Sequence, residues 1–126
     1  MALQESGEMY LETIYVLSKA NSFVRSVDIS EHMGYSKPSV SRAVHLLREQ
    51  GYLEIGELGG ILLTDKGRAA AEKIFERHTV IAGMLMSLGV DPETAAEDAC
   101  RIEHAISDAS FEAIKRHMEQ MQKRRA

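Results

Sequence analysis

Four residues in the second half of the chain interrupt otherwise apolar helical faces with side chains that commonly bind transition metals, and three of them are clustered. Cys100, Glu103 and His104 stand at positions i, i+3 and i+4, so a helix would present a thiol, a carboxylate and an imidazole from one turn. His78 interrupts an otherwise apolar helical pattern. Burying a carboxylate and two imidazoles without partners is unfavourable, and one divalent cation would satisfy them all.

A second pair lies near the N-terminus, where Met9 and Glu12 are three residues apart on one helix face. Imidazole, carboxylate, thiolate and thioether groups form a mixed set that suits a first-row transition metal, whereas Ca²⁺ and Mg²⁺ prefer oxygen ligands. Taken singly, each residue also has an ordinary structural role, such as a core histidine or a cysteine that packs as a small hydrophobe. The residues alone therefore favour a metal site and leave an internal hydrogen-bond network as the alternative.

A different set of polar residues indicates nucleic-acid binding. One predicted helix buries Val40, Val44 and Leu47, and its opposite face is basic, with three cations against the single acid Glu49. That face carries Ser36, Lys37, Ser39, Ser41, Arg42, His45 and Arg48. An arginine is the usual partner of a guanine edge, and serine hydroxyls and a helix N-terminus bind phosphates. A solvated amphipathic helix in an ordinary bundle is the alternative interpretation.

The elements around this helix favour the DNA-binding interpretation. Ser6 is predicted to cap a first helix that runs to about Lys19, and Ser26 a short helix that Gly34 ends. Ser36 is the next predicted cap, with Pro38 in the first turn, and Gly51 ends that helix. Leu53 and Ile55 then alternate with other residues, Gly59-Gly60 supplies a turn, and residues 61–64 return as a second strand, which predicts a β-hairpin. This order is that of a winged helix-turn-helix.

The second half of the chain is predicted to be helical. One helix starts at Thr64 or Asp65 and ends before Gly89, a second starts at Asp91-Pro92, and a last one is capped by Ser107 or Asp108. Their three apolar stripes exceed what one short lobe can cover, so a homodimer is expected. The predicted fold is mainly α, with a winged helix-turn-helix DNA-binding domain at 1–68 and a helical dimerisation and metal-binding domain at 69–126.

Composition excludes several classes of protein. The 126 residues carry a formal charge of −4 and are 44% hydrophobic, which suits one compact domain or two small lobes. No apolar run is long enough to span a membrane, and the first residues do not form a secretory signal. A single cysteine rules out an internal disulfide and predicts a cytoplasmic location. The absence of a nucleophile–base pair and of a nucleotide-binding glycine loop argues against an enzyme.

Several segments together resemble the metal-dependent repressors typified by the diphtheria toxin repressor and the manganese transport regulator. The resemblance covers the whole chain. It is carried by the predicted helix-turn-helix and by segments 8–15, 63–67, 77–78, 98–104 (Asp98-Ala-Cys-Arg-Ile-Glu-His104) and 106–108. It implies a homodimeric winged-helix repressor whose corepressor is Mn(II) or Fe(II).

The resemblance also implies roles for individual residues. Met9, Cys100, Glu103 and His104 match the metal ligands of the iron-responsive branch, and Glu12 and His78 match ligand positions of the manganese branch. Ser36, Pro38, Ser39 and Arg42 fall on DNA-contacting positions. The chain departs from the family at Ala82 and Ala96, where members carry ligands of a second site. It is also expected to lack the C-terminal SH3-like domain of longer members.

These observations predict a regulator that represses metal-uptake genes when a metal bridges the first helix to the dimerisation lobe. Its expected partner is double-stranded palindromic operator DNA, with no membrane partner. By the Irving–Williams order, Zn(II), Ni(II) or Co(II) are expected to bind in vitro as well. Two alternatives are a winged-helix repressor that responds to an organic ligand and one that responds to oxidation of Cys100.

Overall fold

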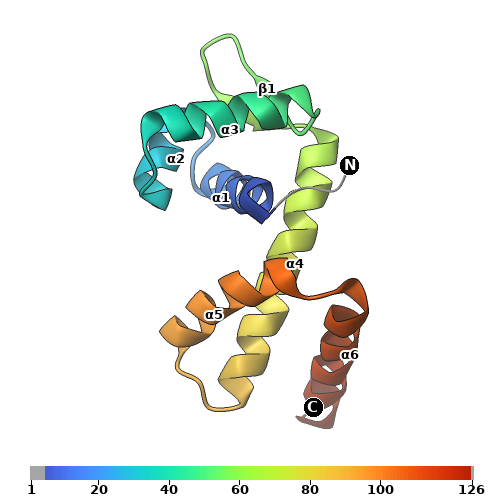
Figure 1. Cartoon of the computed structure of the whole chain (residues 1–126). Coiled ribbons are helices and arrows are strands. Elements are labelled where there is room, and N and C mark those ends of the chain that lie inside the picture. Colours follow the sequence, from blue (N-terminus) through green and yellow to red (C-terminus); the bar gives the residue numbers. More distant parts are fainter. Residues whose placement is uncertain (1–4, 126) are drawn as a thin grey trace. The chain divides into compact units, whose positions relative to one another are not determined.

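A computed structural model describes residues 5–125 and confirms the mainly α fold with one small antiparallel sheet (Figure 1). The chain divides into two compact units, Met1–Lys73 and Ile74–Ala126. In chain order the elements are α1 (Glu5–Ala20), α2 (Ser26–Met33), α3 (Lys37–Glu49), β1 (Leu53–Ile55), β2 (Ile61–Leu63), α4 (Asp65–Ser87), α5 (Pro92–Ala105) and α6 (Asp108–Arg125). The domain boundary predicted after residue 68 falls within α4, and this boundary stays a prediction.

The turn between α2 and α3 forms as its residues predict. Gly34 ends α2 with φ 74°, a left-handed conformation that costs glycine nothing. Two residues later Ser36 caps α3, because its hydroxyl accepts the backbone N–H of Ser39 at 3.3 Å, and Pro38 lies in the first turn. This tight connection between two helices confirms the helix-turn-helix.

Two predicted helix caps are wrong. Ser6 lies inside α1, which already includes Glu5. Ser26 is the first helical residue of α2, and the cap position belongs to Arg25. The carboxylate of Asp28 accepts the backbone N–H of Arg25 at 2.9 Å, so an acid three residues into the helix satisfies the N–H that precedes it. The helix therefore begins one residue earlier than a serine cap would place it.

The hairpin packs against the helices of the N-terminal unit. β1 and β2 pair antiparallel with Leu53 opposite Leu63, and the backbone N–H of Ile61 donates to the carbonyl of Val24 at 2.8 Å. This bond attaches the second strand to the connection between α1 and α2. The buried core of this unit consists of Tyr10, Leu11, Ile14, Val24, Ile29, Val40, Val44, Leu47, Leu53, Ile61 and Ala71.

Thr64 and Gly67 join the hairpin to α4. The Thr64 hydroxyl donates to the carbonyl of Gly51 at 2.7 Å and accepts the N–H of Gly67 at 3.1 Å, so Thr64 caps α4. A Cβ on Gly67 would lie 2.0 Å from the carbonyl oxygen of Tyr52. Only glycine allows the backbone of α4 to approach the hairpin this closely.

The C-terminal unit packs the second part of α4, α5 and α6 around Ile81, Ala82, Ala99 and Phe111. α5 starts at Asp91-Pro92 as predicted, with Asp91 as its cap. The hydrogen bonds that Asp91 accepts from the N–H and hydroxyl of Thr94 hold the pKa of its carboxyl below the usual value. Lys115 of α6 pairs with Glu76 of α4 at 3.3 Å, which raises the pKa of the lysine. None of the helices within residues 5–125 combines the length and apolar character needed to cross a membrane.

Candidate metal centre and nucleic-acid interface

Within the C-terminal unit, α4 and α5 bring together three of the predicted metal ligands. One ligand atom each of His78, Cys100 and Glu103 lies within 4.8 Å of the others. Cys100 and Glu103 are three residues apart on α5, so helical spacing puts them on one face, and the packing of α4 adds His78. A cluster of an imidazole, a thiol and a carboxylate offers three different donor types to one ion.

Glu103 lies at the centre of this cluster and is the only charged or polar residue among the buried ones that the structure describes, with 1% of its surface exposed. Its Oε2 is 3.1 Å from Nδ1 of His78. Its Oε1 is 3.2 Å from Nε2 of His104, outside hydrogen-bonding geometry, and accepts no hydrogen bond from the described residues. A buried carboxylate oxygen without a donor is costly, and a cation is the partner that removes the cost, so the residues fit a metal ion.

The neighbouring side chains restrict the orientation of the two imidazoles. The ring of His78 stacks against Phe75, with centroids 6.4 Å apart and planes 25° apart. The His104 side chain is 1% exposed. Cys100, by contrast, is an exposed residue. The site therefore combines two restricted imidazoles and a buried carboxylate with the thiol of an exposed cysteine.

Arg77, which the sequence did not single out as functional, contacts the end of the ligand-bearing helix. Its Nη1 donates to the carbonyl oxygens of Glu103 at 3.1 Å and Ile106 at 2.8 Å, and its Nη2 pairs with Asp108. The guanidinium also lies over the ring of Phe111, 5.3 Å from the centroid. The only sequence signal for this contact was the position of Arg77 directly before His78.

The predicted DNA-contacting face lies on α3 and its N-terminal cap. Seven of its eight residues are exposed, and Ser39 is half-buried; the eight are Ser36, Lys37, Pro38, Ser39, Ser41, Arg42, His45 and Arg48. Nη2 of Arg42 donates to the hydroxyl of Ser39 at 3.4 Å, which directs the guanidinium toward the first turn of the helix. His45 lies 3.4 Å from Glu49, where a protonated imidazole would form an ion pair.

Tyr35 is an exposed aromatic residue at the same end of α3 that the sequence interpretation omitted. Its ring centroid is 6.0 Å from that of Tyr10, and its residue surface is 43% exposed. Burial raises the pKa of Tyr10, Tyr35 raises it further, and the cation of Arg42 lowers it in part. Tyr10 thus keeps its proton at neutral pH and supports the turn that carries Tyr35 and Ser36.

Two family models match the chain in the same order as its two units. Residues 2–61 match the N-terminal DNA-binding domain of the iron-dependent repressors, and residues 64–125 match their metal-binding and dimerisation domain. A helix-turn-helix transcriptional regulator of Methanocaldococcus jannaschii is 35% identical over 93% of this chain and 95% of its own length. The transcriptional regulator MntR of Escherichia coli O6:H1 is 33% identical over 84% of this chain and 68% of its own. The chain belongs to the iron-dependent repressor family.

Solved structures agree with this assignment. The manganese regulator SloR superposes with a TM-score of 0.80 at 30% identity, covering 94% of this chain and 55% of SloR. A manganese-dependent transcriptional repressor in complex with manganese gives a TM-score of 0.83 at 28% identity, over 90% of this chain and 52% of that one. The chain spans about half the length of these structures. As an iron-dependent repressor family member, it is a metal-dependent DNA-binding regulator and not an enzyme, as predicted.

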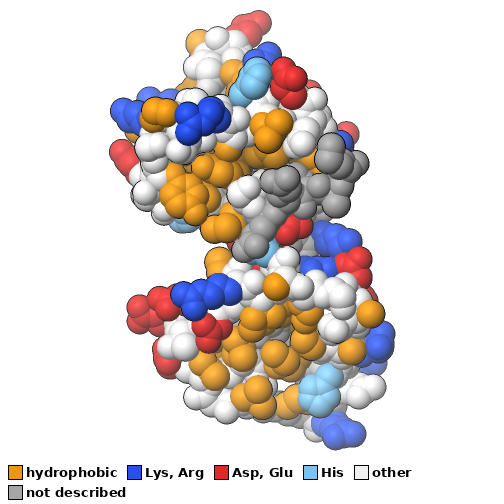
Figure 2. Space-filling view, in the orientation of Figure 1, with side chains coloured by type: hydrophobic (Ala, Val, Ile, Leu, Met, Phe, Trp, Pro, Cys, Tyr) orange, Lys and Arg blue, Asp and Glu red, His pale blue; other side chains and the backbone are white. Residues whose placement is uncertain are grey.

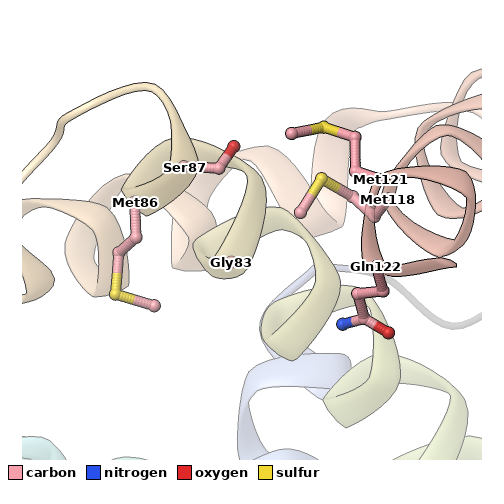
Figure 3. A pocket seen from close by; sticks show the side chains of 6 residues that line it. All are labelled: Gly83, Met86, Ser87, Met118, Met121 and Gln122. Atoms are coloured by element: carbon pink, nitrogen blue, oxygen red, sulfur yellow. The ribbon is translucent and has the colours of Figure 1, made fainter. Parts of the chain in front are cut away.

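The unit that matches the dimerisation domain has apolar surface to bury. Hydrophobic side chains gather on the face of this unit seen in Figure 2, and Met86 and Leu88 are 45% and 74% exposed. α4 and α6 also enclose a groove of about 440 Å³, into which Met118 and Met121 project from α6 toward Ser87 (Figure 3). Surface of this kind is what dimerisation of a family member removes from water.

Met9 and Glu12 lie on α1 in the N-terminal unit, three residues apart and half-buried. The structure therefore joins His78, Cys100, Glu103 and His104 within one unit. The assignment of Met9 and Glu12 as ligands rests on the resemblance and on their residue types, and it stays a prediction.

Proposed function

We propose that this protein represses transcription when Mn(II) or Fe(II) binds at the cluster around Glu103. The observation that carries the proposal is the buried oxygen Oε1 of Glu103, which accepts no hydrogen bond from the described residues although two imidazoles and a thiol lie beside it. A bound divalent cation would compensate the negative charge of this buried carboxylate.

The chemistry of the donors assigns their roles. Glu103 and the Cys100 thiolate would provide negative charge, and His78 a neutral nitrogen whose second ring N–H needs an acceptor. Glu103 lies at the right distance to be either that acceptor or a direct ligand. His104 lies on the other side of the same carboxylate. From the resemblance we infer that Met9 and Glu12 complete the coordination shell.

The donor set and the relatives support different metals. Two of the structural relatives are a manganese regulator and a manganese-dependent repressor. The thiol of Cys100 and the thioether of Met9 are softer donors and favour Fe(II) over Mn(II). Zn(II), Ni(II) and Co(II) bind such sites more tightly than either in vitro, so supply in the cell would decide the physiological metal.

The DNA partner would be read by α3. Its exposed face has Arg42 in position for a guanine edge and the serine-rich N-terminal turn for phosphates. A two-fold dimer presents two such helices, so we propose a palindromic operator with half-sites about one DNA turn, or a multiple of it, apart. We propose that the genes repressed by this protein are those for metal uptake.

A selection experiment tests this function. The protein is used to enrich a random double-stranded DNA pool in EDTA, and in parallel with Mn(II), anaerobic Fe(II) or Zn(II) added singly. We expect enrichment of a palindromic sequence only in the presence of metal. Equal enrichment in EDTA would refute metal control and leave the winged helix as a DNA reader.

Two variants separate the alternatives within the same assay. Glu103→Gln removes the buried negative charge, so DNA binding by this variant should require about 100-fold more metal. Cys100→Ser keeps a small polar side chain and removes the thiol chemistry. If oxidant released DNA from the wild type but not from Cys100→Ser, and EDTA released neither, a thiol switch would replace the proposed metal switch.

A further inference from the structure

Glu103 is held at both ends by two consecutive residues of α4. Nδ1 of His78 lies 3.1 Å from Oε2 of the Glu103 carboxylate. Nη1 of Arg77 donates to the backbone carbonyl of Glu103, also at 3.1 Å. The side chain and the backbone of one candidate ligand are thus fixed from the same turn of the neighbouring helix. A ligand held at only one end retains freedom to rotate out of the site.

The Arg77 contacts occur where α5 has unsatisfied carbonyl groups. The last carbonyls of a helix lack partners within the helix. One nitrogen of Arg77 donates to the carbonyl of Glu103, in the last turn of α5, and to that of Ile106, the residue directly after the helix. A cation at a helix C-terminus also interacts favourably with the helix dipole. The Arg77 side chain is only 13% exposed, so these hydrogen bonds are shielded from water.

Arg77 also connects α5 to the start of α6. Its second terminal nitrogen pairs with Asp108, and its guanidinium lies over Phe111, a buried residue of the core of this unit. One side chain therefore links three helices at the turn that follows Glu103 and His104. A lysine has a single donor nitrogen and cannot reproduce the planar fork that reaches these acceptors together.

We propose that Arg77 is a positioning residue that pre-organises Glu103 and His104 for metal binding. The inference rests on the proposed function, because it assigns Arg77 a role at the same metal site. Arg77 would not be a metal ligand. It fixes the C-terminal turn of α5, so that the free-energy cost of ordering this turn does not reduce the affinity for metal. Residues that support metal ligands in this indirect way commonly change affinity by about 10–100-fold when removed.

The test compares Arg77→Gln and Arg77→Lys with the control Lys115→Gln. Lys115 also bridges α4 and α6, through Glu76, and its substitution removes one cation from the same pair of helices without touching α5. The dissociation constants for Mn(II) and Co(II) are measured by competition with a chelator, well below the midpoint of thermal unfolding. The Co(II) absorption spectrum reports both thiolate ligation by Cys100 and coordination geometry.

We expect metal affinity to fall about 10–100-fold in Arg77→Gln and by less in Arg77→Lys, which keeps the charge and one hydrogen bond. The Lys115→Gln control should stay within about threefold of the wild type, since an exposed ion pair contributes little. An altered Co(II) spectrum in Arg77→Gln would further indicate displaced ligands. Lower thermal stability alone, with wild-type affinity and spectrum, would reduce Arg77 to a structural residue and overturn the inference.

The wild-type measurement separates this inference from the proposed function. If the wild-type protein binds no metal, the metal-controlled repressor itself is refuted. If the wild type binds metal and Arg77→Gln binds it equally well, only the role of Arg77 is refuted. Should Arg77→Gln fail to fold, Arg77→Lys decides the question, because it is expected to bind metal more weakly than the wild type while remaining folded.

Discussion

Replacing Glu103 by glutamine should change metal-free stability and metal-dependent stability in opposite ways. The side chain is fully buried between His78 and His104, and glutamine has almost the same shape without the charge. In the metal-free protein the substitution removes a buried charge and keeps an oxygen that can accept from His78. Because a buried carboxylate whose charge no metal compensates is costly, and glutamine removes the charge without opening a cavity, we expect the metal-free variant to be at least as stable as the wild type.

The loss of metal-dependent stability can be estimated from linkage. Structural zinc sites with four ligands bind with about 10–16 kcal/mol, or about 3 kcal/mol per ligand, so losing one ligand weakens binding about 100-fold. A metal present at 100 times its dissociation constant stabilises the wild type by about 2.7 kcal/mol. At the same metal concentration the variant would be near its dissociation constant and gain only about 0.4 kcal/mol.

Urea unfolding with and without Mn(II) measures both quantities. Glu97→Gln is the matched control, because it makes the same substitution at an exposed position of α5. The control should keep both the metal-free stability and the gain from metal. A Glu103→Gln protein with the full wild-type gain from metal would refute the assignment of Glu103 as a ligand. A metal-free variant several kcal/mol less stable than the wild type would refute the argument that the charge is a burden without metal.

Three further predictions concern single residues. Arg42→Ala should cost about 1–3 kcal/mol of operator binding and relax the preference at one base pair, as measured by fluorescence anisotropy with single-base operator variants. Gly67→Ala should lower the free energy of unfolding by about 2 kcal/mol or more, because the added Cβ would lie 2.0 Å from the Tyr52 carbonyl oxygen. In the control Gly56→Ala the nearest atom to the added Cβ is 3.7 Å away, so the free energy of unfolding should change by less than about 0.5 kcal/mol. Asp91 has a lowered pKa, so the stability it contributes is present above its usual value of 3.8 and is lost as the pH falls through the lower folded value. Thermal unfolding followed against pH should show this acid loss in the wild type and not in Asp91→Asn, and an identical pH profile for the two proteins would contradict it.

Local sequence signals predicted most of the secondary structure. Gly34 and Ser36 determine the turn before α3 through backbone conformation and a capping hydroxyl, both of which act over three residues. The two wrong caps were local as well. At α2, Ser26 was predicted as the cap because serine is a common capping residue. The capping hydrogen bond is instead accepted by Asp28, three residues after Arg25.

The metal cluster was only partly predictable. The spacing of Cys100, Glu103 and His104 is a local property of one helix, so the sequence alone indicates that the three lie together. The pairing of His78 with Glu103 depends on how α4 packs against α5, which periodicity does not determine. Arg77 was not predictable in its role, because two of its acceptors are backbone carbonyls, which every residue possesses.

The charge distribution of the N-terminal unit determines which element can contact DNA phosphates. α3 carries three cations, Lys37, Arg42 and Arg48, and one acid at its last residue, Glu49, whereas residues 52–64, which include both strands of the hairpin, carry two acids and neither lysine nor arginine. Phosphates would therefore be attracted to α3 and repelled by the hairpin. Each neutralised phosphate contributes about −0.9 to the slope of log affinity against log salt concentration. The three cations of α3 therefore limit the contribution of each protomer to this slope to about −3. A measured slope much steeper than twice this value for a dimer would show that other cations contact DNA, and Lys37→Gln should reduce the slope by about 1 per protomer if α3 carries the contacts.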